Sequence, residues 1–396
     1  MKRLIKQLSG IAVALVAAVG SLVAQAQEPM LVEKQSFSLP EYTTHGGEHI
    51  KDVRVGWEAY GKLNAAKDNV ILVTHFFSGN SHAAGRYAPD DPQPGYWDSI
   101  IGPGKAIDTD KYYVISVDSL VNAYPHLPSV ITTGPATINP DTGQPYGLDF
   151  PVVTIRDFVN VQKALLESLG ISRLHAVIGA SMGSLQAIEW AATYPDWVDR
   201  MVSVIGTAAM DAWTIAGLEA WAQAIKLDPN WNNGNYYDSE APLDGVTMAQ
   251  ALITHSAMHP DIFNQTAPAQ QTLPPEGLKS VTNTLPATQW LYGSSRQRAP
   301  LADANHILYL VRANQLFVAG HQQTLTEGLK NIQAETLFLP ASNDLLLMPY
   351  MAEAAVSELR QLGKETELEM IDGPWGHLDG IYSIQQKAEK IRQFLQ

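Results

Sequence analysis

A serine between two glycines is the residue best suited to nucleophilic chemistry in this chain. Residues 179–183 read Gly-Ala-Ser-Met-Gly, with Ser181 at the centre. An apolar stretch, Leu174–Gly179, precedes the motif, and a helical pattern, Ser184–Tyr194, follows it. A tight strand-to-helix turn of this kind, a nucleophile elbow, raises the serine hydroxyl above a sheet and needs glycine for close backbone approach. The motif therefore predicts that Ser181 is the nucleophile of an acyl-transfer reaction.

A nucleophilic serine needs a base, and the base needs an acid to orient it. When such a triad follows an elbow, the chain order is serine, acid, histidine. Downstream of Ser181, the strand pattern Glu335–Pro340 runs into a polar loop that contains Asp344, and Glu365–Ile371 runs into a loop that contains His377. Loops at the carboxyl ends of parallel strands carry the sites of α/β sheets. We therefore predict that Asp344 orients His377, which acts as the base.

Other acids and histidines fit these roles less well. Asp372 and Asp379 lie too close to His377 in sequence to come from the preceding strand's loop. His255 and His259 have the spacing of one helix face, but the H-E-x-x-H pattern of a zinc enzyme is absent. The sequence predicts no metal site and no bound cofactor.

Two backbone N–H groups are expected to stabilise the oxyanion that forms during acyl transfer. One is that of Met182, directly after the nucleophile, and the other comes from the loop after an early strand. Residues 75–80 (His-Phe-Phe-Ser-Gly-Asn) follow the apolar stretch Asn69–His75, which makes Phe77 the second predicted donor. An ordinary glycine turn is the alternative interpretation of this loop.

The elements that must position these residues form an α/β pattern. Apolar strand patterns alternate with amphipathic helical patterns at Thr154–Leu169 and Met351–Leu362, which predicts a mainly parallel sheet covered by helices on both faces. Between residues 208 and 317 no convincing strand occurs, and Ala212–Lys226 has a helical pattern. We predict a core of residues 27–207 and 318–396 with a mostly helical cap, 208–317, inserted between two strands. The predicted strands are Asn69–His75, Tyr112–Ser119, Leu174–Gly179, Met201–Gly206, Glu335–Pro340 and Glu365–Ile371.

Composition and the N-terminus restrict the cellular setting. The 396 residues are 45% hydrophobic and carry a net charge of −14, which excludes a disordered chain and argues against nucleic acid as a partner. Residues 1–26 combine basic residues, an apolar run shorter than the roughly 20 residues of a membrane span, and Ala-Gln-Ala. This predicts a cleaved signal peptide and a periplasmic or secreted protein with no membrane attachment after cleavage. The absence of cysteine fits an oxidising compartment, and such a compartment lacks acyl-CoA.

Several longer motifs resemble a known family over nearly all of the chain after residue 26. Residues 78–85 (SGNSHAAG), 97–110 (WDSIIGPGKAIDTD), 133–156 (TGPATINPDTGQPYGLDFPVVTIR), 179–190, 228–237 (DPNWNNGNYY) and 303–305 (DAN) are similar to the homoserine O-acetyltransferase branch of the α/β-hydrolase superfamily. The resemblance implies the α/β-hydrolase fold, a triad of Ser181, Asp344 and His377, and an oxyanion hole that includes Phe77. It also implies a homodimer formed through the cap.

Three positions depart from that family's pattern. Leu301 stands where an arginine of the family grips the substrate carboxylate, and Ile307 stands in place of a tyrosine. Leu378 replaces the acidic residue that meets the substrate ammonium group. Each replacement makes the acceptor pocket more apolar, although Arg296 or Arg298 remains an alternative source of the missing positive charge.

Three functions are compatible with these residues. The first is an exported serine hydrolase that cleaves a small acyl ester through an acyl-enzyme on Ser181. The alternative is an acyl-CoA-dependent O-acyltransferase of the homoserine O-acetyltransferase type, which requires that residues 1–26 do not direct export. The third is a non-catalytic binding protein on the same fold. The acyl chain and the alcohol of the substrate do not follow from the sequence.

Overall fold

The computed structural model describes residues 29–268 and 278–396. The predicted signal peptide, residues 1–26, lies outside the described residues. Within the described ranges, no helix has both the length and the apolarity needed to cross a membrane.

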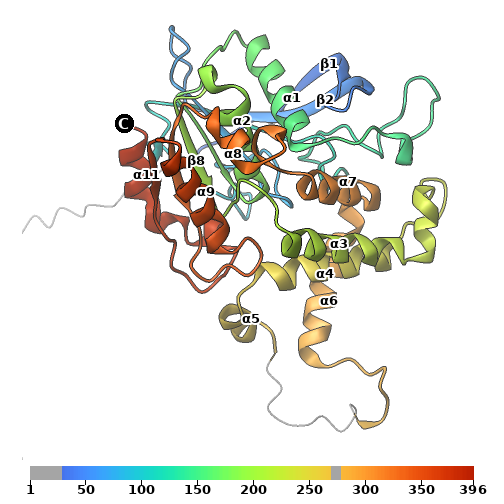
Figure 1. Ribbon diagram of the computed structural model, residues 1–396. Helices are drawn as coiled ribbons and strands as arrows, with labels where there is room; N and C mark the ends of the chain where they lie inside the picture. The colour runs from blue at the N-terminus through green and yellow to red at the C-terminus, as the bar shows by residue number, and fades with distance from the viewer. Residues whose placement is uncertain (1–28, 269–277) are drawn as a thin grey trace, which may run out of the picture.

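An eight-stranded sheet forms the centre of the molecule (Figure 1), with strand order β1-β2-β6-β3-β7-β8-β9-β10. β1 pairs antiparallel with β2, β2 pairs antiparallel with β6, and all remaining neighbours are parallel. The strands are β1 (Gln35–Thr43), β2 (His49–Tyr60), β3 (Val70–Thr74), β6 (Tyr113–Val117), β7 (Ala176–Ala180), β8 (Arg200–Val204), β9 (Glu335–Leu339) and β10 (Thr366–Leu368). A separate two-stranded sheet pairs β4 (Ile101–Gly102) with β5 (Ile107–Asp108).

Each of the six predicted strands overlaps a strand of this sheet, from β3 to β10. The β1–β2 hairpin was absent from the prediction, because both strands are partly exposed and β2 carries charged residues that obscure its apolar face. The parallel strands β3, β7 and β8 are buried along almost their whole length, which is why their sequences form short apolar runs.

The two faces of the sheet bury two separate cores. On one face, Leu72 and Val177 pack with helices α1 (Ile155–Ser168), α2 (Met182–Thr193) and α9 (Pro349–Gln361). On the other face, Ile71 and Ile178 pack with Trp97 and with the C-terminal helices α10 (Asp379–Tyr382) and α11 (Ala388–Phe394). This double coverage confirms the predicted fold class.

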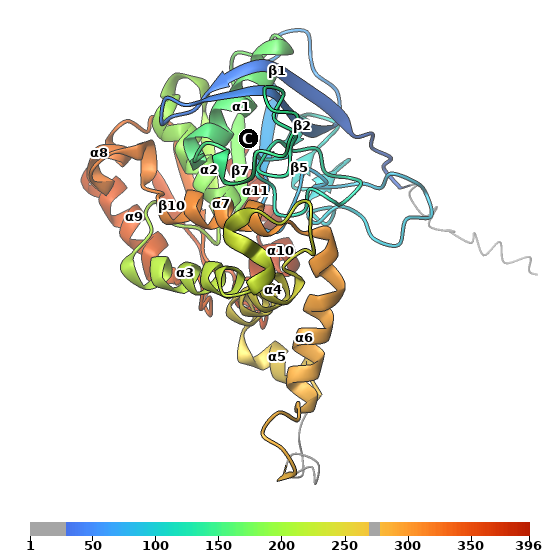
Figure 2. The same ribbon diagram turned by 90° about the vertical axis from the view of Figure 1, so that its right-hand side faces the viewer.

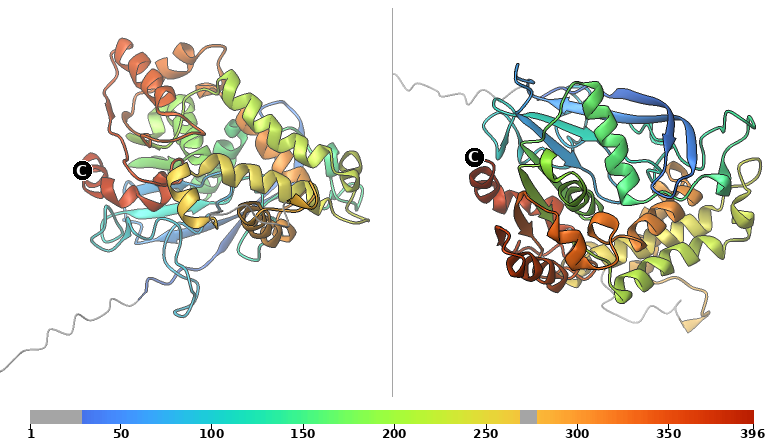
Figure 3. Two further views of the ribbon diagram at one scale, coloured as in Figure 1. Left: turned by 90° about the horizontal axis from the view of Figure 1, so that it is seen from below. Right: turned by 45° about the horizontal axis from the view of Figure 1, so that its top comes forward.

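Helices α3 to α7 lie between β8 and β9 and form a separate lobe (Figures 1 and 2). The chain enters and leaves this lobe side by side, since Ala209 and Val318 form an antiparallel bridge and Met210 N–H donates to Phe317 O (3.1 Å). α3 and α4 pack against each other, as the view from below shows (Figure 3). The lobe contains α3 (Ala212–Lys226), α4 (Leu243–Ala257), α5 (Pro260–Thr266), α6 (Pro286–Arg298) and α7 (Ala304–Gln315). The domain limits at 207/208 and 317/318 stay a prediction.

Candidate active site

Ser181 occupies a strained turn between β7 and α2. Its backbone has φ 55° and ψ −121°, a combination that non-glycine residues rarely adopt. A Cβ atom added to Gly179 would lie 2.2 Å from Thr74 Oγ1, and one added to Gly183 would lie 2.0 Å from the carbonyl oxygen of Thr74. Both glycines are therefore required by the close approach of β3, and the predicted elbow has the geometry that its sequence indicates.

The structure brings the three predicted triad residues together. His377 Nε2 lies 2.7 Å from Ser181 Oγ, and His377 Nδ1 lies 2.7 Å from Asp344 Oδ2. All three residues are buried. With the proton on Nδ1, the imidazole donates to the carboxylate and leaves Nε2 free to accept the serine proton. Such a chain of hydrogen bonds can activate a hydroxyl group for attack on a carbonyl carbon.

The loop after β9 fixes the carboxylate of Asp344. Asp344 Oδ1 accepts hydrogen bonds from the N–H groups of Leu346 (2.8 Å) and Leu347 (3.0 Å), so that Oδ2 remains for His377. Asn343 Nδ2 donates to Gly373 O (2.7 Å) and ties this loop to the loop that carries His377. The acid and the base are thus held by their own loops and by each other.

Asp379 supports the histidine loop without contacting the imidazole. Its Oδ2 accepts from the N–H groups of Trp375 (3.2 Å) and Gly376 (3.1 Å), the two residues before His377. Burial raises the pKa of the Asp379 carboxyl group above its ordinary value. Asp372 is exposed. The structure therefore brings neither rival acid to His377, in line with the choice of Asp344.

The two predicted oxyanion donors come from the elbow and from the loop after β3. Met182 is the first residue of α2, and Phe77 follows β3 in a turn closed by a hydrogen bond from Gly79 N–H to Phe76 O (2.9 Å). Within residues 29–268 and 278–396, the N–H groups of Phe77 and Met182 donate no hydrogen bond. Buried N–H groups are almost always paired, so two free ones beside a nucleophile are suited to an incoming anionic oxygen.

A small apolar cavity of about 30 Å³ opens beside Ser181. The ring of Phe77 packs edge-on against Trp221 in its wall (centroids 5.6 Å apart). The cavity is lined by Phe77, Ser181, Met210, Thr214, Leu218, Trp221, Asn314, Leu346 and Leu347, none of which is charged. The sequence analysis did not identify Met210, Thr214, Leu218, Asn314, Leu346 or Leu347 as part of this wall. The i, i+4, i+7 spacing of Thr214, Leu218 and Trp221 places them on one face of a helix. The spacing does not show that this face points toward Ser181.

None of the three positions that depart from the family pattern lines this cavity. Ile307 is buried in α7, Leu301 is exposed, and Leu378 directly follows His377. Arg296 forms an ion pair with Asp244, and Arg298 donates to Thr254 Oγ1 (2.9 Å). Neither arginine lines the cavity, so the described structure gives no support to either as a replacement for the missing positive charge at Ser181.

Comparisons with known proteins show to which family the chain belongs. The family model described as "alpha/beta hydrolase fold" matches residues 105–383. A homoserine O-acetyltransferase of Symbiobacterium thermophilum is 39% identical over 88% of this chain and 90% of its own length, and one of Methanococcoides burtonii is 38% identical over 90% of this chain and 72% of its own. The chain belongs to the homoserine O-acetyltransferase-like branch of the α/β-hydrolase family.

Two solved structures that are similar to this chain carry the names of different activities. A crystal structure of esterase E22 is 58% identical, covers 92% of this chain and 100% of its own, and superimposes with a TM-score of 0.91. The homoserine O-acetyltransferase of Bacillus anthracis is 38% identical, covers 92% of this chain and 98% of its own, and superimposes with a TM-score of 0.89. The curated relatives as a group support the predicted acyltransferase alternative better than the predicted hydrolase, and the esterase structure supports the hydrolase.

Proposed function

We propose that this protein transfers acyl groups through an ester bond to Ser181. The observation that carries the proposal is the chain of hydrogen bonds from Asp344 through His377 to Ser181 Oγ, at a strained elbow beside two free N–H groups. A non-catalytic binding protein has no need of this arrangement, since buried strain and free N–H groups both cost stability.

The acylation half of the reaction follows from the geometry. Ser181 Oγ attacks the carbonyl carbon of an ester while His377 Nε2 takes the hydroxyl proton. The carbonyl oxygen becomes an oxyanion that accepts hydrogen bonds from the N–H groups of Phe77 and Met182. When the intermediate collapses, the bond to the alcohol breaks, and His377 returns the proton to the departing oxygen.

We propose water as the acceptor that removes the acyl group. His377 then takes a proton from water, the hydroxide attacks the acyl carbon, and Ser181 leaves with that proton as the carboxylic acid forms. Two observations support water over an amino-acid acceptor. The cavity beside Ser181 has no charged residue in its wall, and the esterase is 58% identical to this chain. The apolar wall of the cavity suits the hydrocarbon part of an acyl group.

The second candidate is transfer from acyl-CoA to the hydroxyl group of homoserine. The observation in its favour is the name shared by the curated relatives at 34–39% identity. Homoserine carries a carboxylate and an ammonium group, and an uncharged wall leaves both without a charge-assisted partner. Each such bond is worth about 1.5–3 kcal/mol.

One experiment separates the two candidates. Purified protein is incubated with p-nitrophenyl acetate and p-nitrophenyl butyrate, and in parallel with acetyl-CoA plus homoserine, each beside Ser181→Ala. We expect release of nitrophenol from these esters, and no release of CoA. Homoserine-dependent CoA release that exceeds ester hydrolysis would establish the transferase, and full activity in Ser181→Ala would reject both.

A further inference from the structure

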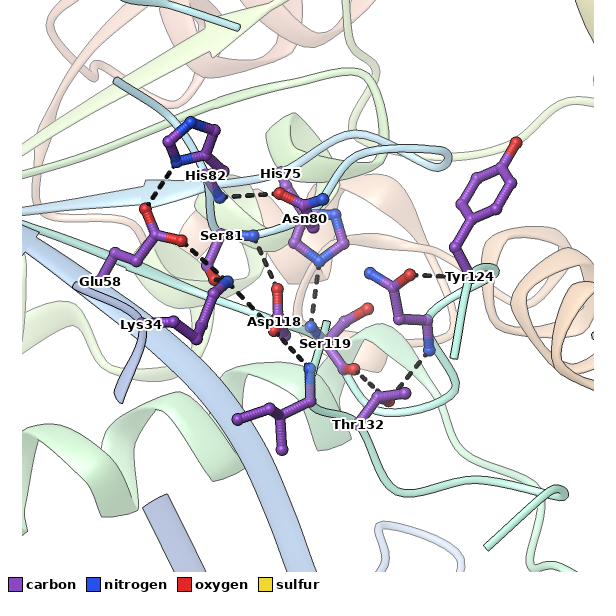
Figure 4. A network of polar contacts seen from close by, with 12 residues as sticks. Lys34, Glu58, His75, Asn80, Ser81, His82, Asp118, Ser119, Tyr124 and Thr132 are labelled. Atoms are coloured by element: carbon purple, nitrogen blue, oxygen red, sulfur yellow. Dashed lines mark hydrogen bonds and ion pairs between the residues drawn. The ribbon is translucent and has the colours of Figure 1, made fainter. Parts of the chain in front are cut away.

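The loop that carries Phe77 is fastened to the loop that follows the neighbouring strand β6. His75 Nε2 accepts from Ser119 N–H (3.0 Å), and Ser81 N–H donates to Asp118 Oδ1 (2.7 Å), as Figure 4 shows. Both contacts lie at the ends of the segment 75–81, so they fix where the loop begins and ends. They do not by themselves fix the turn between them, where Phe77 lies.

A third contact reaches the turn itself. Asn122 Nδ2 donates to the carbonyl oxygen of Gly79 (2.9 Å), and Gly79 N–H closes the turn on Phe76 O (2.9 Å). Asn122 is fully buried, and its Oδ1 accepts from Tyr124 N–H (3.0 Å). The carboxamide therefore uses its donor on the Phe77 turn and its acceptor on its own loop, so it cannot rotate without losing both bonds.

The residue before Asn122 is strained. Val121 has φ 51°, a value that is an outlier for a β-branched residue. Such strain persists only where the surroundings impose it, and it concentrates at functional sites. Val121 N–H donates to Thr133 O (2.9 Å), which helps to hold this conformation. Ser181, on the elbow after β7, also has a positive φ (55°), so the loops after both strands that neighbour β3 contain a strained residue.

Asn122 also contacts the helical lobe. The backbone carbonyl oxygen of Asn122 lies 2.8 Å from Nδ1 of His306, a buried residue of α7. Since His306 Nε2 accepts from Ala136 N–H (3.2 Å), Nδ1 carries the proton and donates to Asn122. The same residue thus connects α7, whose Asn314 lines the cavity, to the turn that presents Phe77.

We propose that Asn122 is a positioning residue for the oxyanion hole. Its side chain holds the Phe77 N–H group in place through Gly79, and its backbone fixes the position of this turn relative to helix α7. This inference rests on the proposed acyl transfer at Ser181. An N–H group that stabilises the oxyanion acts in the transition state and contributes little to substrate binding. Loss of its positioning should therefore lower kcat and leave KM nearly unchanged.

The test is Asn122→Ala, measured with a short-chain p-nitrophenyl ester. We expect kcat to fall about 10-fold or more, below the roughly 10²–10³-fold loss caused by removing an oxyanion donor, with KM within about two-fold. A trifluoromethyl ketone adds to the serine and places an oxyanion in the hole, so its inhibition constant should weaken in step with kcat/KM.

Asn160→Ala is the matched control. Asn160 on α1 also forms two side-chain bonds, to the hydroxyl groups of Tyr42 (3.2 Å) and Tyr194 (2.7 Å), but it lies outside the site. We expect its kcat to be unchanged. If Asn122→Ala does not fold, Asn122→Ser serves in its place, since its side chain is one bond too short to reach Gly79.

The outcomes separate this inference from the proposed function. An unchanged kcat in a folded Asn122 variant overturns the positioning role while Ser181→Ala remains inactive. A fall in kcat without weaker binding of the trifluoromethyl ketone also overturns it, because the oxyanion hole is then intact. Full activity in Ser181→Ala would instead reject the proposed acyl-enzyme.

Discussion

At the scale of single residues, the chemistry of the site depends on the position of each triad residue relative to the next. Ser181 gains its reactivity from His377, and His377 gains its orientation from Asp344, whose other oxygen is occupied by Leu346 and Leu347 N–H. The neighbouring acid, Asp379, instead accepts hydrogen bonds from the backbone N–H groups of the two residues before His377. Two carboxylates near one histidine therefore have different functions, and only one of them contacts the imidazole.

Replacement of Asp344 by asparagine tests that division. An amide beside Nδ1 favours the wrong imidazole tautomer, so we expect kcat to fall roughly 10⁴-fold with the fold intact. Ester hydrolysis and circular dichroism would measure the two effects. Retention of more than a tenth of the activity would mean that another acid orients His377.

Gly183→Ala tests the close approach at the elbow. The added Cβ would lie 2.0 Å from Thr74 O, so we expect a loss of about 1–3 kcal/mol or more in the free energy of unfolding. Gly217→Ala is the control, because an added Cβ in this exposed part of α3 meets nothing within 4 Å. There we expect a gain of about 0.5–1 kcal/mol. Urea unfolding measures both, and equal effects would contradict the steric explanation.

At the scale of elements, the sequence predicts best what depends on local pattern. The helix predicted at Ala212–Lys226 is α3 with the same bounds, and each predicted parallel strand is present, because continuous apolar runs and helical spacing are local signals. Strand β2 was not predicted because it contains a fully buried glutamate, Glu58. The lysine that pairs with Glu58, Lys34, lies 24 positions earlier in the sequence, so no local pattern indicates the pair. The cavity wall and the contacts of Asn122 escaped for the same reason, since they join segments distant in sequence.

Helices α1 and α2 hold the segment that returns from the helical lobe. Arg156 on α1 forms an ion pair with Glu189 on α2, and Glu189 Oε2 accepts from Gly320 N–H (2.7 Å) while Arg156 donates to Gly320 O (2.9 Å). The Glu189 side chain is fully buried. Removal of Arg156 would leave a buried carboxylate without its cation.

We expect Arg156→Met to lower the free energy of unfolding by about 3–5 kcal/mol. Arg173→Met removes an ion pair to Asp199 whose arginine is largely exposed, and there we expect less than about 1 kcal/mol. Chemical denaturation of both variants gives the comparison. Equal losses would show that the buried pair does not anchor the returning segment.

At the scale of the whole molecule, a buried ionic network links β2 to the oxyanion loop. Burial opposes the charge on Glu58. A hydrogen bond from His82, the positive charge of Lys34, and hydrogen bonds from Lys34 and Tyr87 outweigh this effect and lower the Glu58 pKa from 4.5 to about 2. A carboxyl group whose pKa is lower in the folded state stabilises the fold above its unfolded pKa. That stabilisation is lost as pH falls from about 4.5 to about 2.

Glu58→Gln provides the test. We expect wild type to be more stable than the variant at pH 7, and the difference to shrink as the pH falls below about 4.5. Urea unfolding across this pH range measures it. A difference that stays constant with pH would show that the charge of Glu58 does not supply the stabilisation.

Export is the remaining proposal at this scale. If residues 1–26 are a cleaved signal peptide, the mature protein begins at Gln27. N-terminal sequencing of protein from the periplasmic or extracellular fraction of a bacterial host should give that residue. Recovery of the full-length chain from the cytoplasm alone would contradict export and would make acyl-CoA accessible to the enzyme.

The most direct test of the central claim is the mass of the protein after reaction with a p-nitrophenyl phosphonate. Attack by Ser181 Oγ on phosphorus releases nitrophenol and leaves a stable phosphonyl ester. We expect one phosphonyl group per chain, located on Ser181 by peptide mapping, and much slower labelling in His377→Ala. Labelling at another residue, or equal labelling in Ser181→Ala, would contradict the acyl-enzyme mechanism.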